Sequence, residues 1–283
     1  MSRFLNLLVY SNLLIASCST SLSYIACSYF KVSETNNILG FVFFATLFVY
    51  SFHRKVDHLY YGNRKLTPQD KWIESKKRFY TFLILSSFSI AFYYYLGLPK
   101  SANILLFPLF IISILYVLQI NIGLKLKTLR SIPYLKPFVI AFVWGGISSM
   151  LPVICQDGVS ALLSLKVHLF ALAMSFSVFG QAIPFDIRDI ELDRSASLKT
   201  LPQLLGINNV KFLSFISYSF SVVSLWIISS EVNLLIVSFT IGLSSSAIII
   251  SKLNNKNPYL HYSLVLEGSL AFPFICFIIL SHF

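Results

Sequence analysis

The sequence predicts an all-α, polytopic membrane protein with about nine transmembrane helices. Of its 283 residues, 56% are hydrophobic and 12% are charged, and the mean hydropathy is +0.76. Soluble domains have roughly 25% charged residues. The apolar residues form long continuous runs and do not alternate as the strands of a transmembrane β-barrel do. Because no linker, repeat or low-complexity tract divides the chain, residues 1–283 are predicted to form a single integral membrane domain.

The basic residues predict how the chain crosses the bilayer. With the N-terminus inside, 19 of the 22 Lys and Arg residues fall on the inner side of nine spans, and Lys31, Lys100 and Lys166 fall outside. This bias predicts a cytoplasmic N-terminus. The net charge of +11 therefore indicates topology and contact with anionic head groups, and no nucleic-acid partner is expected. The nine apolar segments are residues 4–30, 37–52, 79–98, 102–121, 137–154, 164–184, 212–230, 232–251 and 261–281.

The first segment contains Ile15-Ala16-Ser17-Cys18, which is similar to a bacterial lipoprotein cleavage site. The apolar run continues to about Phe30, which favours a retained first helix over cleavage and lipidation. No Cys-x-x-Cys pair occurs in the sequence, so the four cysteines are expected to be buried thiols.

The second segment ends in a polar cluster. Tyr50, His53 and Asp57 are spaced i, i+3 and i+7, so a helix places them on one face. Together with Arg54 and Lys55, they would suit Mg²⁺ and a polyphosphate ligand. Alternatively, the basic residues anchor the helix at the lipid head groups.

The third to fifth segments are rich in aromatic residues. Tyr93-Tyr94-Tyr95 is expected to form part of an interfacial belt at the face opposite the acidic clusters. Some of the other rings either line a cavity or simply pack against neighbouring helices. These are Tyr116, Tyr134 and Trp144, and Tyr218 in the seventh segment.

The sixth segment leads into an acidic run. Four of the eleven acidic residues lie between Asp186 and Asp193, just after Pro184, which is expected to break or kink the helix. On a helix, Asp186, Asp189 and Asp193 point within roughly 60° of one another. Three carboxylates on one face repel each other unless a cation lies between them, so the spacing predicts a magnesium site. Alternatively, the run is an acidic helix start stabilised by the helix dipole.

The remaining polar residues in apolar segments are few. Glu267 lies within the ninth segment, where it would either contact an acceptor substrate or bond to a neighbouring helix. His168 and Glu231 are expected to be anchors near the outer interface.

The acidic run also carries a family resemblance. Asp186-x-Arg-Asp-x-Glu-x-Asp193, followed by Lys199-Thr200-Leu201-Pro202 and Gly206, resembles the second aspartate-rich motif of the UbiA superfamily of intramembrane prenyltransferases. The resemblance implies that Mg²⁺ and an isoprenyl diphosphate bind between two such motifs on the cytoplasmic side. Asp189 and Asp193 would be the main metal ligands and catalytic residues, with Asp186 and Asp57 as further ligands. Lys199 and Arg188 would lie near the diphosphate.

The first motif departs from the family pattern. Asn-Asp-x-x-Asp-x-x-x-Asp falls on Val49, Tyr50, His53 and Asp57, so three of its four metal-directed residues are replaced. His53, Arg54 and Lys55 could compensate by holding diphosphate oxygens directly.

The function expected from the resemblance is prenyl transfer from an allylic diphosphate to a lipophilic acceptor, with quinone-type lipid biosynthesis favoured and Mg²⁺ as cofactor. The expected location is a bacterial cytoplasmic membrane, with the acidic loops on the cytoplasmic side and membrane lipid around the bundle. An inactive protein of the same fold is one alternative. A metal-binding or transport protein is another, although transporters place their ionisable groups near the bilayer midplane.

Overall fold

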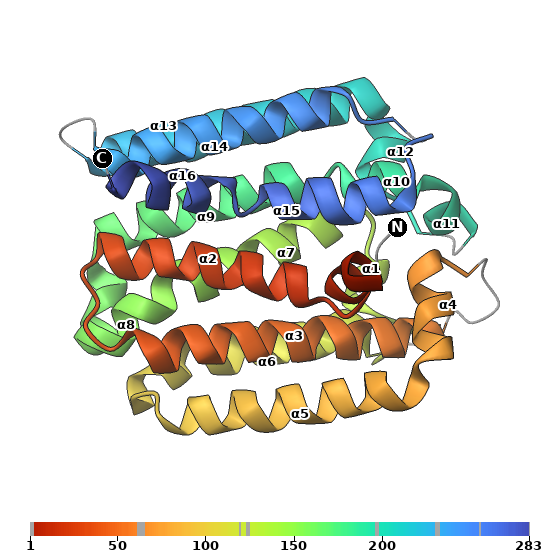
Figure 1. Ribbon diagram of the computed structural model, residues 1–283, viewed down its shortest axis with the longest axis horizontal. Coiled ribbons are helices and arrows are strands. Elements are labelled where there is room, and N and C mark those ends of the chain that lie inside the picture. Colours follow the sequence, from red (N-terminus) through yellow and green to blue (C-terminus); the bar gives the residue numbers. More distant parts are fainter. Residues whose placement is uncertain are drawn as a thin grey trace.

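The protein is a bundle of long helices that run along one common direction (Figure 1). The structure is a computed structural model that describes residues 3–60, 66–118, 120–122, 125–195, 198–229, 233–254 and 256–282. Within these ranges, seven helices are long and apolar enough to cross a membrane, and the number rises to nine if each of two bent helix pairs is one span. The nine predicted segments correspond to these seven helices and two pairs.

The bounds of the elements follow the predicted segments closely in the apolar parts. They are α1 Arg3–Tyr10, α2 Leu13–Tyr29, α3 Thr35–Tyr60, α4 Pro68–Ser75, α5 Lys77–Leu96, η1 Lys100–Ala102, α6 Asn103–Val117, β1 Ile120–Ile122, β2 Lys125–Lys127, η2 Leu129–Ser131, α7 Lys136–Gly145, η3 Gly146–Met150, α8 Leu151–Asp157, η4 Gly158–Leu163, α9 Leu165–Ala182, α10 Phe185–Arg188, α11 Ile190–Ser195, α12 Leu201–Leu205, α13 Ile207–Ile228, α14 Leu234–Ser251, η5 His261–Leu266, α15 Glu267–Ser269 and α16 Phe272–Ser281.

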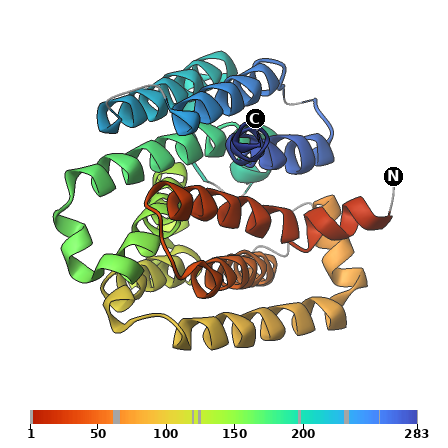
Figure 2. The same ribbon diagram turned by 60° about the vertical axis from the view of Figure 1, so that its left-hand side comes forward.

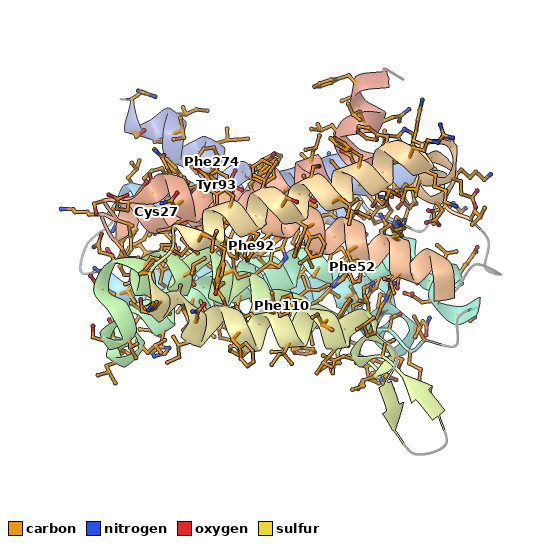
Figure 3. The ribbon with its side chains drawn as sticks, turned by 90° about the horizontal axis from the view of Figure 1, so that it is seen from below. Cys27, Phe52, Phe92, Tyr93, Phe110 and Phe274 are labelled. Atoms are coloured by element: carbon orange, nitrogen blue, oxygen red, sulfur yellow. The ribbon has the colours of Figure 1, made fainter. Side chains whose placement is uncertain are left out.

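The predicted all-α class is confirmed for the bundle. The strands that the structure describes are β1 and β2, which pair antiparallel, with Ile122 opposite Lys125. They follow α6, which ends at Val117, whereas the apolar segment was predicted to continue to residue 121. The hairpin projects from the end of the bundle that carries α4 and α11 (Figures 1 and 3).

The arrangement of the helices leaves α2 in the middle of the bundle. The pair α13 and α14 lies along one edge and α5 along the opposite edge, with α2 between them (Figures 1 and 2). Helix α9 packs closely on α13. A Cβ atom at Gly180 of α9 would lie 2.7 Å from the Tyr218 ring, so the missing side chain allows the two helices to approach. Tyr218 therefore packs between helices and does not line a cavity.

The outer surface of the bundle is apolar. Phe92 and Phe110 are each 52% exposed, and aromatic and aliphatic side chains cover the outside (Figure 3). On a soluble protein such a surface would be an aggregation hazard, whereas lipid tails solvate it. The protein is therefore an integral membrane protein.

The fifth, sixth and ninth spans are interrupted. Helix α9 ends at Ala182, Pro184 follows, and the short helices α10 and α11 carry the acidic run. This confirms the predicted break at Pro184. Two π-helical turns, η3 and η5, lie within the fifth and ninth spans. Irregular backbone at membrane depth is tolerated where it is buried in protein or lines a cavity, so the breaks point towards the site.

Candidate functional site

The described residues enclose a cavity of about 240 Å³ between the spans. One part of its wall is polar and lies where α3, α7 and α9–α10 reach the end of the bundle near α4. The other part is apolar and lies deeper in the bundle. The polar wall contains Asn12, His53, Arg54, Asp57, Gln69, Arg130, Lys136, Arg188, Asp189 and Tyr259, and the deeper wall contains Val49, Tyr50, Val143, Trp144, Val178, Glu267 and Leu270.

Arg54 of α3 is held in place by the start of α4. Its Nε lies 3.3 Å from Oδ1 of Asp70, and its Nη2 donates to the Thr67 hydroxyl at 3.1 Å. Thr67 and Asp70 form the capping box of α4, in which Thr67 caps the helix and Asp70 accepts from the Thr67 backbone N–H. A local helix-start signal therefore also places the carboxylate that pairs with Arg54.

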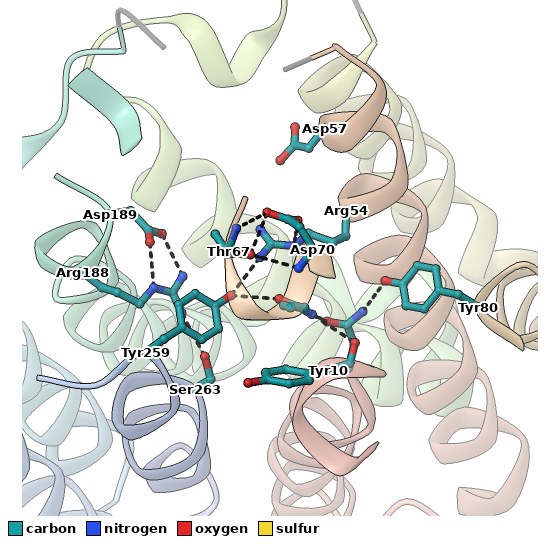
Figure 4. A network of polar contacts seen from close by, with 12 residues as sticks. Tyr10, Arg54, Asp57, Thr67, Asp70, Tyr80, Arg188, Asp189, Tyr259 and Ser263 are labelled. Atoms are coloured by element: carbon teal, nitrogen blue, oxygen red, sulfur yellow. Dashed lines mark hydrogen bonds and ion pairs between the residues drawn. The ribbon is translucent and has the colours of Figure 1, made fainter. Parts of the chain in front are cut away.

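Arg188 and Asp189 form a second ion pair with bidentate geometry. The guanidinium Nε and Nη2 donate to the two carboxylate oxygens at 2.7 and 2.8 Å (Figure 4). Burial by itself raises the pKa of Asp189, but the Arg188 guanidinium outweighs it and holds the pKa below its ordinary value. Asp189 is therefore a carboxylate at any physiological pH.

Tyr259, just before the ninth span, joins the two arginines. Its hydroxyl accepts from Arg54 Nη2 at 2.8 Å and donates to Gln69 at 3.0 Å. The Arg188 guanidinium carbon lies 4.4 Å from the centroid of the Tyr259 ring, which is a cation–π contact. Figure 4 shows this chain of contacts from Asp189 through Tyr259 to Arg54 and Asp70. One side chain thus fixes both guanidinium groups at the wall of the cavity.

Two further ion pairs complete the polar wall. Arg130, which comes from η2, pairs with Asp57 of α3, and Lys136, the first residue of α7, pairs with Asp186 of α10. Asp57 and Asp186 are 5% and 1% exposed. Buried carboxylates of this kind are stable only when a cation compensates them. Four cations of the polar wall are therefore paired one to one with carboxylates, of which Asp57 and Asp189 line the cavity and Asp70 and Asp186 do not.

Asp193 differs from the other carboxylates. It is 4% exposed, and its Oδ2 forms no hydrogen bond to any residue that the structure describes. Burial is the largest cause of its raised pKa, followed by the opposing effect of Lys136 and the repulsion of Asp186 and Asp189. A buried oxygen without a partner is costly, so a ligand is expected there.

The three carboxylates of the acidic run do not lie on one continuous helix. The helix is interrupted at Asp189, which lies between α10 and α11, and Asp186 and Asp189 are paired with Lys136 and Arg188. Among the described residues, no group of three His, Cys, Asp or Glu side chains converges as a metal site. The single continuous helix on which the prediction rested does not form, because the helix is interrupted at Asp189, between α10 and α11.

The predicted face of α3 does form. Tyr50, His53 and Asp57 all line the cavity. The Nε2 atom of His53 is bonded to the Ser113 carbonyl oxygen at 2.9 Å, and the His53 ring stacks on Tyr116. Val49 and Tyr50 offer no metal ligand of the kind that Mg²⁺ prefers, and His53 is already bonded. The contacts of this half of the site are therefore with neighbouring helices.

Two predicted substrate-binding lysines lie outside the cavity wall. Lys55 follows Arg54 on the helix and points to α5, where its Nζ donates to Thr81 at 3.2 Å. Lys199 is exposed, and its backbone carbonyl accepts from Tyr134. Of the rings proposed as lining, Tyr116 and Trp144 line the cavity, whereas Tyr134 and Tyr218 do not.

Five residues of the polar wall were not predicted as site residues. Arg130 and Lys136 were used only to predict topology, and Asn12, Gln69 and Tyr259 carried no signal. A lysine directly before an apolar span normally reaches the lipid head groups, so the position of Lys136 in the sequence gives no signal of its pairing with a buried carboxylate. Cys18, which the sequence linked to possible lipidation, is fully buried within α2.

The carboxylates fit one magnesium ion and do not fit a second. Asp193 supplies an oxygen without a partner among the described residues, although it is not one of the residues that line the cavity. A metal ion there would also draw on Asp189 and Asp186 by displacing Arg188 and Lys136. Mg²⁺ in phosphate sites usually takes only one or two carboxylates and fills its other positions with water and phosphate oxygens. Around Val49, Tyr50 and His53, by contrast, only Asp57 is a carboxylate, and Arg130 occupies it.

An intramembrane helical bundle with a polar cavity at one end is the architecture of the UbiA fold, and comparison with solved structures shows that the protein has this fold. A UbiA homolog from Aeropyrum pernix K1, solved without ligand, matches with a TM-score of 0.68 and 16% identity over 95% of this chain and 98% of that chain. A UbiA homolog from Archaeoglobus fulgidus bound to GPP and Mg²⁺ matches with a TM-score of 0.59 and 14% identity over 98% and 100%. A digeranylgeranylglyceryl phosphate synthase matches with a TM-score of 0.55 and 16% identity over 98% and 97%. No family model and no curated protein matches the sequence.

Proposed function

We propose that the protein is a prenyltransferase that binds an isoprenyl diphosphate, together with Mg²⁺, in the cavity and transfers the isoprenyl group to a lipophilic acceptor. The observation that carries the proposal is the polar wall, in which four cations line one end of an otherwise apolar cavity and each is paired with a carboxylate. The likeness of the fold to a UbiA homolog bound to GPP and Mg²⁺ supports it.

The charge balance of the polar wall selects the kind of ligand. Each cation is already neutralised by its own carboxylate, so a bare anion would leave buried carboxylates unpaired, which is costly. A diphosphate that arrives with a divalent cation brings a much smaller net negative charge than the bare anion does. Its oxygens take the place of the carboxylates on Arg54, Arg130, Lys136 and Arg188, and the released carboxylates face positive charge.

The residues on each side of the reacting bond follow from this placement. Asp189 and Asp193 would hold Mg²⁺, with Asp186 beside them. When bound, Mg²⁺ supplies positive charge to the leaving diphosphate oxygens. Arg188 and Arg54, fixed by Tyr259, stabilise the same charge by donating hydrogen bonds as the allylic C–O bond breaks and its electron pair moves to the diphosphate.

The deeper wall receives the carbon skeleton. The rings of Tyr50, Tyr116 and Trp144 face an allylic cation and stabilise it by cation–π contact while they keep water away. The isoprenyl tail extends past Val178 and Leu270 among the spans. The end of the bundle that carries the polar wall faces the cytoplasm, and the acceptor belongs to quinone-type lipid biosynthesis.

The first test is binding of labelled geranyl diphosphate to the purified protein in nanodiscs, with Mg²⁺ or with EDTA. Asp189→Asn and Asp193→Asn should each lower the Mg²⁺-dependent affinity by about tenfold or more. The matched control is Glu191→Gln, which neutralises an exposed acid on α11 between the two aspartates and should bind normally.

The second test is transfer to a panel of lipophilic phenols and alcohols in the same nanodiscs. Metal-dependent product that is lost in Asp189→Asn supports the enzyme. Metal-dependent binding without any product from the panel favours the inactive protein of the same fold. Binding that is unchanged by EDTA and by both aspartate substitutions contradicts the proposed site.

A further inference from the structure

Glu267 is an acidic residue in the apolar part of the cavity, and the proposed reaction gives it no role. It lies in the ninth span and lines the cavity together with Tyr50, Trp144 and Leu270. A carboxyl group at membrane depth is costly, so its retention there points to a function.

The local backbone places Glu267 at an interruption of the span. The π-helical turn η5 ends at Leu266, Glu267 begins α15, and the span bends by 45° before α16. Neighbouring helices satisfy the backbone around the bend. Gln181 of α9 donates to the Leu266 carbonyl, and the Cys18 thiol donates to the Glu267 carbonyl at 3.4 Å. Single π-helical turns inside spans are frequent at functional sites.

The Glu267 side chain, in contrast to its backbone, is not used by the fold. Across the described ranges, no hydrogen bond or ion pair engages its carboxyl group. The Glu267 carboxyl group therefore forms no bond to a neighbouring helix among the described residues, which was the alternative that the sequence left open. An ionisable group that faces a cavity and serves no structural bond is available to a ligand.

The depth of Glu267 matches the position of the acceptor. It follows Tyr259 by eight residues, which places it roughly 10 Å further along the span than the tyrosine that clamps the arginines. Trp144 follows Lys136 by the same number of residues on α7. With the diphosphate at the arginines and Lys136, as the proposed function requires, the allylic carbon lies on the side of Tyr50, Trp144 and Glu267. A nucleophile must approach it there.

We infer that Glu267 binds the acceptor, and that the acceptor is a lipophilic molecule with a hydroxyl group, of the phenol or alcohol class. An oxygen of the Glu267 carboxyl group accepts the hydrogen bond of that hydroxyl. As the allylic C–O bond breaks and its electron pair leaves on the diphosphate, an electron pair of the acceptor forms the new bond to the allylic carbon. The proton that the acceptor loses moves to Glu267.

The inference is tested by comparing two probes that differ in one hydrogen-bond donor. Equilibrium binding of 4-hexylphenol and of its methyl ether, 4-hexylanisole, is measured on the protein in nanodiscs. The wild type should bind the phenol about tenfold or more tightly than the ether. Glu267→Leu should remove this preference and Glu267→Gln should reduce it, whereas the exposed-acid control Glu34→Gln should retain it.

Geranyl diphosphate binding in the same samples separates this inference from the proposed function. The exposed-acid control Glu34→Gln should bind the diphosphate as the wild type does, and thermal unfolding in the same nanodiscs shows whether the Glu267 variants are folded. A wild type that binds both probes equally, or a phenol preference that survives in Glu267→Leu, overturns the inference. Loss of diphosphate binding in the wild type would overturn the proposed function instead, and the probe comparison would still report on Glu267.

Discussion

At the residue scale, the site depends on how each charge is compensated. Four carboxylates of the polar wall have a cation of their own, and Asp193 has a buried oxygen that no described residue satisfies. The first group holds the empty site in shape. Asp193 is a cost to the empty protein that ligand binding would remove.

The substitution Asp193→Asn should therefore stabilise the protein without ligand and weaken Mg²⁺-dependent diphosphate binding. The raised pKa means that the charged form of Asp193 is disfavoured in the folded state, so its destabilising effect is full above the folded pKa and is relieved as the pH falls through that pKa. Removing the charge should raise the free energy of unfolding at neutral pH by about 1 kcal/mol. Thermal unfolding in detergent from pH 5 to pH 8 measures this, and a lower melting temperature for the variant at pH 8 would contradict it.

The substitution Tyr259→Phe isolates the clamp on the two arginines. It keeps the ring under Arg188 but removes the hydroxyl that accepts from Arg54. Geranyl diphosphate should bind about tenfold more weakly because Arg54 is no longer held at the cavity. Tyr262→Phe is the matched control, since the Tyr262 hydroxyl donates to the Asn254 carbonyl outside the cavity wall. Equal affinities for the two variants would show that the clamp does not matter.

At the element scale, short helices and breaks place the charged groups. Helix α4 lies outside the membrane-spanning helices, yet its capping box presents Asp70 to Arg54. The short helix α10 follows the break at Pro184, and Arg188 and Asp189 at its end line the cavity. These short helices bury little apolar surface, so the residues that start and end them decide where their charged side chains lie.

The substitution Thr67→Ala should affect both α4 and the site. It removes the cap of α4, at a cost of about 1 kcal/mol, and it removes a hydrogen-bond acceptor of Arg54. Diphosphate affinity should fall several-fold, with a small decrease in the melting temperature. Ser75→Ala at the other end of the same helix is the control, and a similar loss of affinity in that variant would contradict the role of the cap.

The sequence predicted the spans much better than the site. Continuous apolar runs define transmembrane helices directly, and the break at Pro184 follows from the chemistry of proline. The pairing of Lys136 with Asp186, or of Arg130 with Asp57, joins residues far apart in the chain and depends on how the spans pack. The spacing of Asp186, Asp189 and Asp193 was misleading because it assumed an unbroken helix, whereas Asp189 lies between two short helices.

At the scale of the whole molecule, the two ends of the bundle differ in chemistry. The polar wall, α4 and the β1–β2 hairpin lie at one end, and η4 lies at the other (Figures 1 and 3). The excess of basic residues in the connections at the first end predicts that it faces the cytoplasm. A diphosphate supplied from the cytoplasm would then reach the polar wall without crossing the bilayer.

Cysteine labelling tests this orientation. Ser75→Cys on α4 and Ser160→Cys in η4 place exposed thiols at opposite ends of the bundle. Cys18 and Cys27 are buried, and the partly exposed Cys155 and Cys276 are replaced by Ser in both variants. In intact cells, a membrane-impermeant maleimide should label position 160 and should reach position 75 only after permeabilisation. The reverse pattern would contradict the predicted topology.

The one-to-one pairing of charges has a consequence for how the protein can change over generations. Loss of either partner alone, for example Asp57 without Arg130, leaves an uncompensated charge in a buried place, whereas loss of both leaves only a gap. Sequence change at such positions is therefore expected to occur in matched steps. Among relatives, the residues at positions 57 and 130, and those at positions 136 and 186, should be inherited as couples, and a double substitution should be tolerated better than either of its halves.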